Sequence, residues 1–254
     1  MARTNYFAGP LPRRFAHRGL SEHAANIDEN SMAAIEAAIA AGATHVESDT
    51  HATKDGHAVL FHDSDLNRVA GVPRQIAELS LSELSSITLN HGSQIPTLGD
   101  VLAGFPDLFL NLDIKSQHAI APTVTEIERH AAHDRVLISS FSESRRKKAL
   151  AMLSKPVATS ASMNKVITAW LSHSFFFGIG FRQITKDIDA FQIPIAKGPI
   201  RLATPRFIRR AKASGTEVHF WTINDPEQMR QLLDLGADGI VTDRVDLLTK
   251  LSAS

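Results

Sequence analysis

The chain has 254 residues, of which 43% are hydrophobic and 21% are charged. This length fits one large domain or two small ones, and the composition is that of a globular protein able to bury a sizeable core. Lysine plus arginine and aspartate plus glutamate number 27 each, so the chain lacks the basic excess of a nucleic-acid-binding protein. The absence of cysteine excludes disulfides, thiolate zinc sites and cysteine nucleophiles.

Two features bear on membrane association. The amino terminus, MARTNYFAGPLPRRF, lacks the apolar core of a signal peptide, and no segment approaches about 18 uninterrupted apolar residues. The sequence therefore predicts a cytoplasmic protein without stable membrane insertion. The run FFFGIGF (175–181) is far too short to span a bilayer, and its length favours a buried barrel element over a surface for lipid tails.

Strand-like runs and helical patterns alternate along the chain. Gly42, Gly215 and Gly236 each end a helical pattern shortly before a strand-like run, where a helix C′ residue adopts the left-handed conformation. This alternation predicts a parallel sheet covered by helices, and eight units fit a closed (β/α)8 TIM barrel formed by 1–254 as a single domain. The predicted strands lie at 13–17, from 45, at 108–114, 136–141, 157–162 and 190–196, from 218 and from 239.

A doubly wound open sheet is the alternative fold. Its dinucleotide-binding version is weakened because no G-x-G-x-x-G motif follows the first strand. Residues 51–107 exceed an ordinary crossover, so we expect a small insertion after the second strand, with KDGHAVLFHD as a β-hairpin arm.

Charged side chains fall on strand faces that point into the predicted barrel. Glu47 and Asp49 share one face of their strand, as do Asp113 and Lys115 of LFLNLDIK. Converging carboxylates repel one another and raise their own pKa values unless a cation compensates them. Oxygen ligands suit a hard cation such as Mg²⁺ or Ca²⁺. The alternative is that each acid pairs with Lys115 or Arg18 in an inert salt bridge.

Several motifs recur together in a fixed order. AHRGL is followed by ENSMAAIEAAIAAGATHVESDTHATKDGHAVLFHD, then by IPTLGDVL, LNLDIK, VLISSF, VHFWTIND and GADGIVTD. In this order and spacing, from residue 15 to about 243, the chain resembles the glycerophosphodiester phosphodiesterase family. The resemblance implies a metal-dependent TIM barrel that hydrolyses glycerophosphodiesters to glycerol 3-phosphate and an alcohol.

The resemblance also assigns roles to individual residues. It implies that His17 and His62 carry out the proton transfers, a role suited to imidazoles at neutral pH. It leaves open which of them is the acid and which is the base. It implies that Glu47, Asp49 and Asp113 hold one divalent cation. The family has Glu in place of Asp113, so this ligand is shorter by about 1.5 Å, roughly one carbon bond.

Three further positions match the family's substrate site. Arg18 and Lys115 would hold phosphate oxygens, although pairing with Glu47 or Asp113 is an alternative that can coexist with this role. Trp221 resembles a platform for the glycerol moiety, and a core position is the equal alternative. Glu29 matches an acid at the site edge, where orienting a histidine and assisting the nearby helix amino terminus are equal alternatives. Asn224 is expected to cap the helix that follows it, with a position on the rim of the site as the alternative.

The predicted function is a phosphodiesterase acting on a small glycerophosphodiester, with no nucleic-acid partner. The nucleophile is left open between water and the substrate's own glycerol hydroxyl. A phospholipase D-like activity on lysophospholipids is the alternative within enzymes, and an apolar groove beside the metal would favour it. A non-catalytic phosphate-binding module is the alternative from another class. The basic cluster SRRKK (144–148) is interpreted as a solvated helix face.

Overall fold

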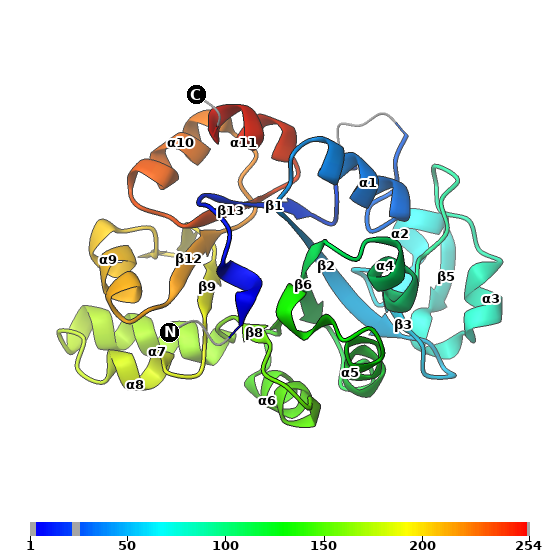
Figure 1. Ribbon diagram of the computed structural model, residues 1–254, viewed down its shortest axis with the longest axis horizontal. Coiled ribbons are helices and arrows are strands. Elements are labelled where there is room, and N and C mark those ends of the chain that lie inside the picture. Colours follow the sequence, from blue (N-terminus) through cyan, green and yellow to red (C-terminus); the bar gives the residue numbers. More distant parts are fainter. Residues whose placement is uncertain (1–3, 22–25, 253–254) are drawn as a thin grey trace.

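The computed structural model describes residues 4–21 and 26–252. Eight parallel strands form a nearly closed barrel, in the order β8-β7-β6-β2-β1-β13-β12-β9, and helices surround it (Figure 1). A parallel bridge between Ser160 and Ala190 joins β8 to β9. The predicted TIM barrel is therefore confirmed, and the open sheet is excluded.

All eight barrel strands lie where the sequence predicts them, because strand-like runs and helical patterns alternate so regularly. The barrel strands are β1 (Arg13–His17), β2 (His45–Ala52), β6 (Phe109–Ile114), β7 (Val136–Ser139), β8 (Ala158–Thr159), β9 (Ala190–Ile193), β12 (Glu217–Phe220) and β13 (Gly239–Thr242). The crossover helices include α1 (Met32–Ala40), α5 (Ile120–Arg129), α6 (Glu143–Met152), α7 (Met163–Phe175), α8 (Phe181–Thr185), α9 (Pro205–Ala213) and α10 (Pro226–Asp234), and α11 (Val245–Ser252) follows the last strand.

The expected insertion follows the second barrel strand. The chain turns at Gly56, and Ala58–Leu60 (β3) pairs antiparallel with the end of β2, as the hairpin prediction requires. The excursion has a small apolar core of its own. It comprises β4 (Asp65–Leu66), α2 (Asn67–Ala70), β5 (Val72–Gln75), the 3-10 helix η2 (Ile76–Glu78) and α3 (Leu81–Ser85). The helix α4 (Leu98–Gly104) follows the excursion, and its buried side chains belong to the barrel core.

The two ends of the barrel differ in chemistry. Near the amino ends of the strands, Tyr6 of the 3-10 helix η1 (Asn5–Phe7) packs edge-on against His45 and Phe109. Burial lowers the pKa of His45 to about 3, so this imidazole is neutral. The opposite ends carry the charged side chains described below, where barrel enzymes place their sites.

One prediction about a short motif is wrong and another holds only in part. Phe175 at the end of α7, and Phe176, Phe177 and Ile179 in the turn that follows it, are exposed, and of FFFGIGF only Phe181 is buried. In SRRKK, Ser144, Lys147 and Lys148 are exposed, as a solvated helix face requires. Arg146 departs from this prediction and is fully buried, because its guanidinium is held by Glu143 at 2.8 Å and Asp187 at 2.9 Å. Paired charges of this kind are the usual exception to the exposure of arginine.

No helix within 4–21 and 26–252 is long and apolar enough to cross a membrane. The cytoplasmic location stays a prediction. The structure also includes the 3-10 helix η3 (Ala132–Arg135) and a small hairpin of β10 (Ala196–Lys197) and β11 (Ile200–Arg201).

Candidate active site

Strand register aligns the predicted site residues in two rows. In the first row, His17 on β1 pairs with Glu47 on β2, which pairs with Asn111 on β6. In the second row, Asp49 on β2 pairs with Asp113 on β6. Neighbouring strands lie about 4.8 Å apart, so the alternation of side chains within each strand brings these groups into one cluster.

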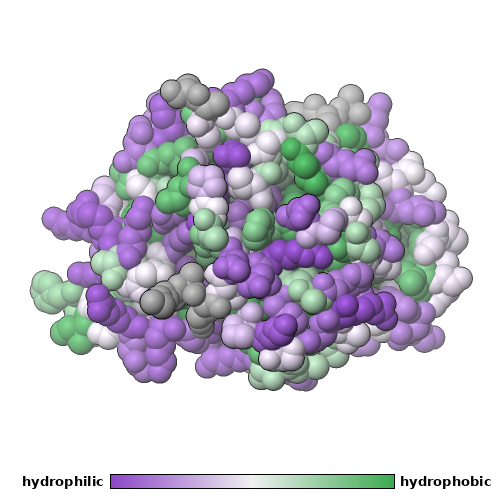
Figure 2. Space-filling view, in the orientation of Figure 1, coloured by the Kyte–Doolittle hydropathy of each residue, from purple (hydrophilic) through white to green (hydrophobic). Residues whose placement is uncertain are grey.

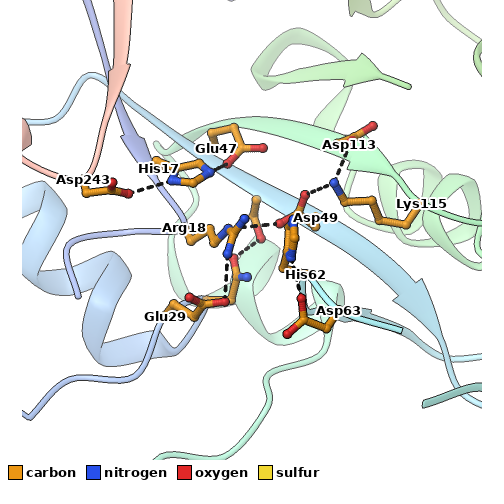
Figure 3. Close-up of polar contacts among 12 residues, drawn as sticks. His17, Arg18, Glu29, Glu47, Asp49, His62, Asp63, Asp113, Lys115 and Asp243 are labelled. Carbon is orange, nitrogen blue, oxygen red and sulfur yellow. Dashed lines mark hydrogen bonds and ion pairs between the residues drawn. The ribbon is translucent and has the colours of Figure 1, made fainter. Parts of the chain in front are cut away.

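Lys115 and Arg18 balance part of the negative charge. Lys115 Nζ lies 2.6 Å from Asp49 Oδ1 and 2.8 Å from Asp113 Oδ2 (Figure 3). Arg18 Nε lies 3.6 Å from Asp49 Oδ2, and Arg18 Nη1 donates to Glu29 Oε1 at 3.1 Å. The ion pairs that the sequence offered as an alternative are therefore present for Asp49 and Asp113.

The backbone directly after β1 aims Arg18 at these acids. Arg18 and Gly19 are both left-handed, with φ of 55° and 85°, so the chain bends sharply after His17. A Cβ on Gly19 would lie 2.7 Å from the backbone of Ala34, closer than real Cβ contacts. Glycine at this position lets the bend pack directly against α1.

Glu47 is the acid that the bases compensate least. Burial, and then the negative charge of Asp49, raise the pKa of Glu47 to about 8. Its nearest basic group is His17, with Nε2 3.9 Å from Glu47 Oε2. Burial also raises the pKa of Asp113, although Lys115 opposes this shift. The three carboxyls are therefore not all ionised at neutral pH, because Glu47 keeps its proton when no further positive charge is present.

Each of the acids has an oxygen atom without a hydrogen-bond partner. Glu47 Oε2, Asp49 Oδ2 and Asp113 Oδ1 are buried and accept no hydrogen bond, and Asn111 Oδ1 nearby shares this property. Buried polar atoms are normally satisfied, so such a set calls for an explanation. In kind, these are the oxygen donors that hard divalent cations prefer.

The arrangement of the acids is not a closed coordination sphere. Within 4–21 and 26–252, no group of three or more His, Asp or Glu side chains converges tightly enough to hold a metal ion. The ammonium of Lys115 lies between Asp49 and Asp113 instead. The donor set fits a divalent cation by its chemistry, and its present geometry is that of an ion-pair network.

His17 is oriented by an aspartate from the last barrel strand. Its Nδ1 lies 2.6 Å from Asp243 Oδ1, and Asn224 Nδ2 donates to Asp243 Oδ2 at 2.7 Å. Burial lowers the pKa of His17, but the bond to Asp243 and the charge of Glu47 outweigh it and raise the pKa overall. The expected helix-capping role of Asn224 is wrong, because Asp225 caps α10.

His62 is also bonded to an aspartate, as His17 is. It follows β3, and its Nδ1 lies 2.7 Å from Asp63 Oδ1. Arg68 Nε donates to Asp63 Oδ2 at 2.6 Å and its Nη2 donates to Glu29 Oε1 at 2.6 Å. Glu29 is thus bound by both Arg68 and Arg18, a positioning role at the edge of the site.

All the predicted site residues line one cleft of about 910 Å³. Its polar end contains His17, Arg18, Glu47, Asp49, His62, Asn111, Asp113 and Lys115. Trp221 lies in the cleft wall rather than in the core, with its ring centroid 6.4 Å from that of Phe141. The remaining wall is mainly apolar and includes Met163, Val166, Ile167, Trp170 and Leu171 of α7.

Sequence reasoning missed three polar residues and one helix of this site. Asp243 stands in GIVTD and Asp63 in FHD, but strand periodicity gives no sign that either contacts a histidine. Arg68 comes from the insertion, whose path the sequence leaves undefined. The helix α7, which forms the apolar cleft wall, comes after the two-residue strand β8. Its residues belong to none of the motifs in the sequence, so no local pattern indicates that they line the cleft.

The fold is a TIM barrel, and its cleft brings two aspartate-bonded histidines and a group of acids to the carboxyl ends of the strands, where TIM-barrel enzymes carry their active sites. Residues 17–247 match the model of the glycerophosphoryl diester phosphodiesterase family. The chain belongs to this family, as the sequence resemblance predicts.

Similar proteins extend over nearly the whole chain. A protein of Mycobacterium tuberculosis named probable glycerophosphodiester phosphodiesterase 2 is 42% identical over 234 residues, covering 92% of this chain and 88% of the relative. A lysophospholipase D of Homo sapiens is 25% identical, covering 92% and 83%. A phosphodiesterase of Oleispira antarctica, solved with the product sn-glycerol-3-phosphate, has a TM-score of 0.76 and 24% identity, covering 96% and 98%.

The raised pKa of Glu47 predicts a pH-dependent stability. Between its ordinary value of 4.5 and about 8, the folded state keeps a proton that the unfolded state has lost, so Glu47 contributes a fall in the free energy of unfolding as pH rises. With a chelator present, Glu47→Gln should lose this contribution. Urea denaturation at several pH values would measure it, and parallel pH dependences for the two proteins would contradict it.

Proposed function

We propose that the protein hydrolyses glycerophosphodiesters to glycerol 3-phosphate and an alcohol by acid–base catalysis with His17 and His62. The observation that carries this proposal is that both imidazoles line one cleft and each is held at Nδ1 by an aspartate. In this arrangement Nε2 of each ring is left to exchange a proton with the substrate. The family match and the name of the mycobacterial relative support the substrate class.

The phosphate would bind at the basic side chains of the polar end. Arg18 and Lys115 both line the cleft, and their donors lie among the acids that fix their orientation. Positively charged donors stabilise the charge on the phosphate oxygens as the phosphorus centre becomes five-coordinate. Trp221 would offer its ring to the glycerol moiety from the opposite wall.

One histidine would remove a proton from the nucleophile, and the other would protonate the leaving alcohol oxygen. The nucleophile is water or the neighbouring glycerol hydroxyl, and the second route passes through a cyclic phosphate. Both routes need one basic and one acidic imidazole in the same complex. Asp243 and Asp63 hold the rings in place during the transfer.

We further propose that Glu47, Asp49 and Asp113 hold one Mg²⁺ or Ca²⁺. The partnerless oxygens of these acids and the pKa of Glu47, about 8, support this assignment. A bound divalent cation supplies Lewis-acid stabilisation of a phosphate oxygen. Because the substrate is itself an anion, a cation bound here would balance both its charge and the charge of an ionised Glu47.

Removal of either histidine should abolish most turnover. His17→Ala and His62→Ala should each lower kcat on glycerophosphocholine by about 10²- to 10⁴-fold, the contribution of a positioned acid or base. Both side chains lie at the cleft surface, so the thermal unfolding midpoint should change little. Asp134→Asn, a change far from the cleft, serves as the control. Full activity in either histidine variant would remove the acid–base assignment.

Divalent cations should govern both activity and stability. A chelator should abolish hydrolysis, and added Mg²⁺ or Ca²⁺ should restore it. Independently of turnover, a cation at about 100 times its Kd should stabilise the folded state by about 2.7 kcal/mol. Calorimetry should show this rise for the natural protein and a smaller one for Glu47→Gln. No response to chelator or cation in either measurement would contradict the metal assignment.

A second candidate activity, phospholipase D-like hydrolysis of lysophospholipids, is favoured by the apolar wall of the cleft. Ile167, Trp170 and Leu171 of α7 extend apolar surface away from the charged end. A glycerophosphodiester headgroup does not need such a surface, whereas the acyl chain of a lysophospholipid does. The Homo sapiens relative is named a lysophospholipase D.

A substrate comparison tests this candidate. If the apolar wall binds an acyl chain, Leu171→Gln should reduce kcat/KM on monomeric lysophosphatidylcholine by about tenfold or more relative to glycerophosphocholine, because one lost apolar contact in a pocket costs about that much. Ile39→Gln, an exposed change on α1, is the matched control. Equal losses on both substrates would remove the lysophospholipid assignment and leave the phosphodiesterase activity intact.

A further inference from the structure

The turn between α7 and α8 presents a cluster of large apolar side chains to solvent. This cluster, here called the apolar tip, consists of Phe175, Phe176, Phe177 and Ile179. Phe177 is 90% exposed and Ile179 is 78% exposed. Figure 2 shows hydrophobic surface bordered by hydrophilic surface at the left edge, where α7 meets α8. Exposed apolar clusters of this kind mark contact surfaces.

The apolar tip is a defined turn with its own hydrogen bonds. Gly178 N donates to Ser172 O at 2.7 Å, and Ile179 N donates to Phe176 O at 2.8 Å. Ser172 Oγ also donates to Ile179 O at 2.8 Å. Gly178 has φ of 88°, and the guanidinium of Arg210 occupies the space that a Cβ at this position would need. These contacts hold the phenylalanines outward.

An apolar stripe connects the tip to the cleft. Ile167, Leu171 and Phe175 are spaced four residues apart on α7, so they lie on one helix face, and all three are more than one third exposed. The first two line the cleft. Trp170, also in the cleft wall, packs edge-on against Phe175 with ring centroids 5.6 Å apart. The cleft and the tip therefore share one continuous apolar surface.

The segment that carries the tip is strongly basic. Residues 144–216 contain fourteen lysines and arginines but only two acids, Asp187 and Asp189, although the chain as a whole has no net charge. Asp187 pairs with Arg146 and Lys165, and Glu143, directly before the segment, pairs with Arg146 and Lys147, so these pairs neutralise some of the bases. The bases still outnumber the acids along this segment, and the tip therefore lies in a basic stretch of the chain.

Several of these bases lie beside the tip itself. Arg210 Nη1 lies 3.0 Å from His173 Nδ1, one turn before the end of α7. Burial lowers the pKa of His173, and the charges of Arg210 and Arg206 lower it further, which places both guanidinium groups near this turn. Arg182, exposed in the first turn of α8, follows the tip in the chain.

We propose that the apolar tip docks on a lipid surface containing anionic phospholipids. The aromatic and aliphatic side chains of the tip would enter the boundary between the lipid headgroups and the acyl chains. The surrounding lysines and arginines would contact the anionic headgroups. The stripe along α7 would then offer a lipid chain an apolar path to the cleft. A second copy of the chain fits less well, because a symmetric contact would bring two basic surfaces together. The proposal adds to the proposed function and can fail separately from it.

Vesicle sedimentation tests this docking. The natural protein should bind vesicles of equimolar phosphatidylglycerol and phosphatidylcholine, more weakly at high salt and more weakly still on phosphatidylcholine alone. A variant with Phe176→Ser, Phe177→Asn and Ile179→Ser should lower the partition coefficient by about tenfold or more, because three exposed apolar groups no longer enter the interface. Asparagine suits the left-handed conformation at 177.

Controls separate docking from folding and catalysis. Ile39→Ser removes an exposed isoleucine on α1 and should bind vesicles as the natural protein does. The tip variant should keep full activity on glycerophosphocholine, and His17→Ala should keep full vesicle binding. Unchanged binding by the tip variant, or no binding by the natural protein, would overturn the proposal. So would a concentration-dependent dimer that the tip variant abolishes, since the surface would then serve self-association.

Discussion

The cleft depends on three buried carboxyls that cannot all be ionised together. Lys115 is shared by Asp49 and Asp113, Arg18 is shared by Asp49 and Glu29, and the base that pairs most directly with Glu47 is His17. Burial and the charge of Asp49 raise the pKa of Glu47 to about 8, so this carboxyl keeps its proton at neutral pH. An incoming phosphodiester adds a negative charge, which a low-dielectric cluster of this kind disfavours. The proposed divalent cation would supply the positive charge that allows Glu47 to ionise and the phosphate to bind.

The two histidines are held alike but in different electrostatic surroundings. The second oxygen of Asp243 accepts from the neutral amide of Asn224, whereas Asp63 shares its second oxygen with the guanidinium of Arg68. The aspartate beside His17 thus keeps more of its negative charge for the imidazole, in agreement with the raised pKa of His17. The unequal partners give the two rings distinct environments, as a division into acid and base requires.

The sequence predicted the barrel strands and the strand-borne acids because both leave local periodic signals. Glu47, Asp49 and Asp113 follow the two-residue alternation of strands, so their convergence could be expected from spacing alone. The bond from His17 to Asp243 spans 226 residues and exists because the barrel closes between β1 and β13, which no local pattern encodes. The length of the apolar run at 175–181 predicts a buried element, but Gly178 and Gly180 adopt left-handed conformations, and the turn they form leaves the phenylalanines exposed.

The two sides of the cleft differ in chemistry. The strands β1, β2 and β6 carry the acids, while the segment 144–216, rich in lysine and arginine, supplies α7, whose apolar side chains form the other cleft wall. In the proposed lysophospholipid reaction the phosphate ester would lie at the charged side, and the acyl chain would contact α7 from Leu171 toward the apolar tip. The same helix would then serve both the proposed docking on lipid and the placement of the substrate beside His17 and His62.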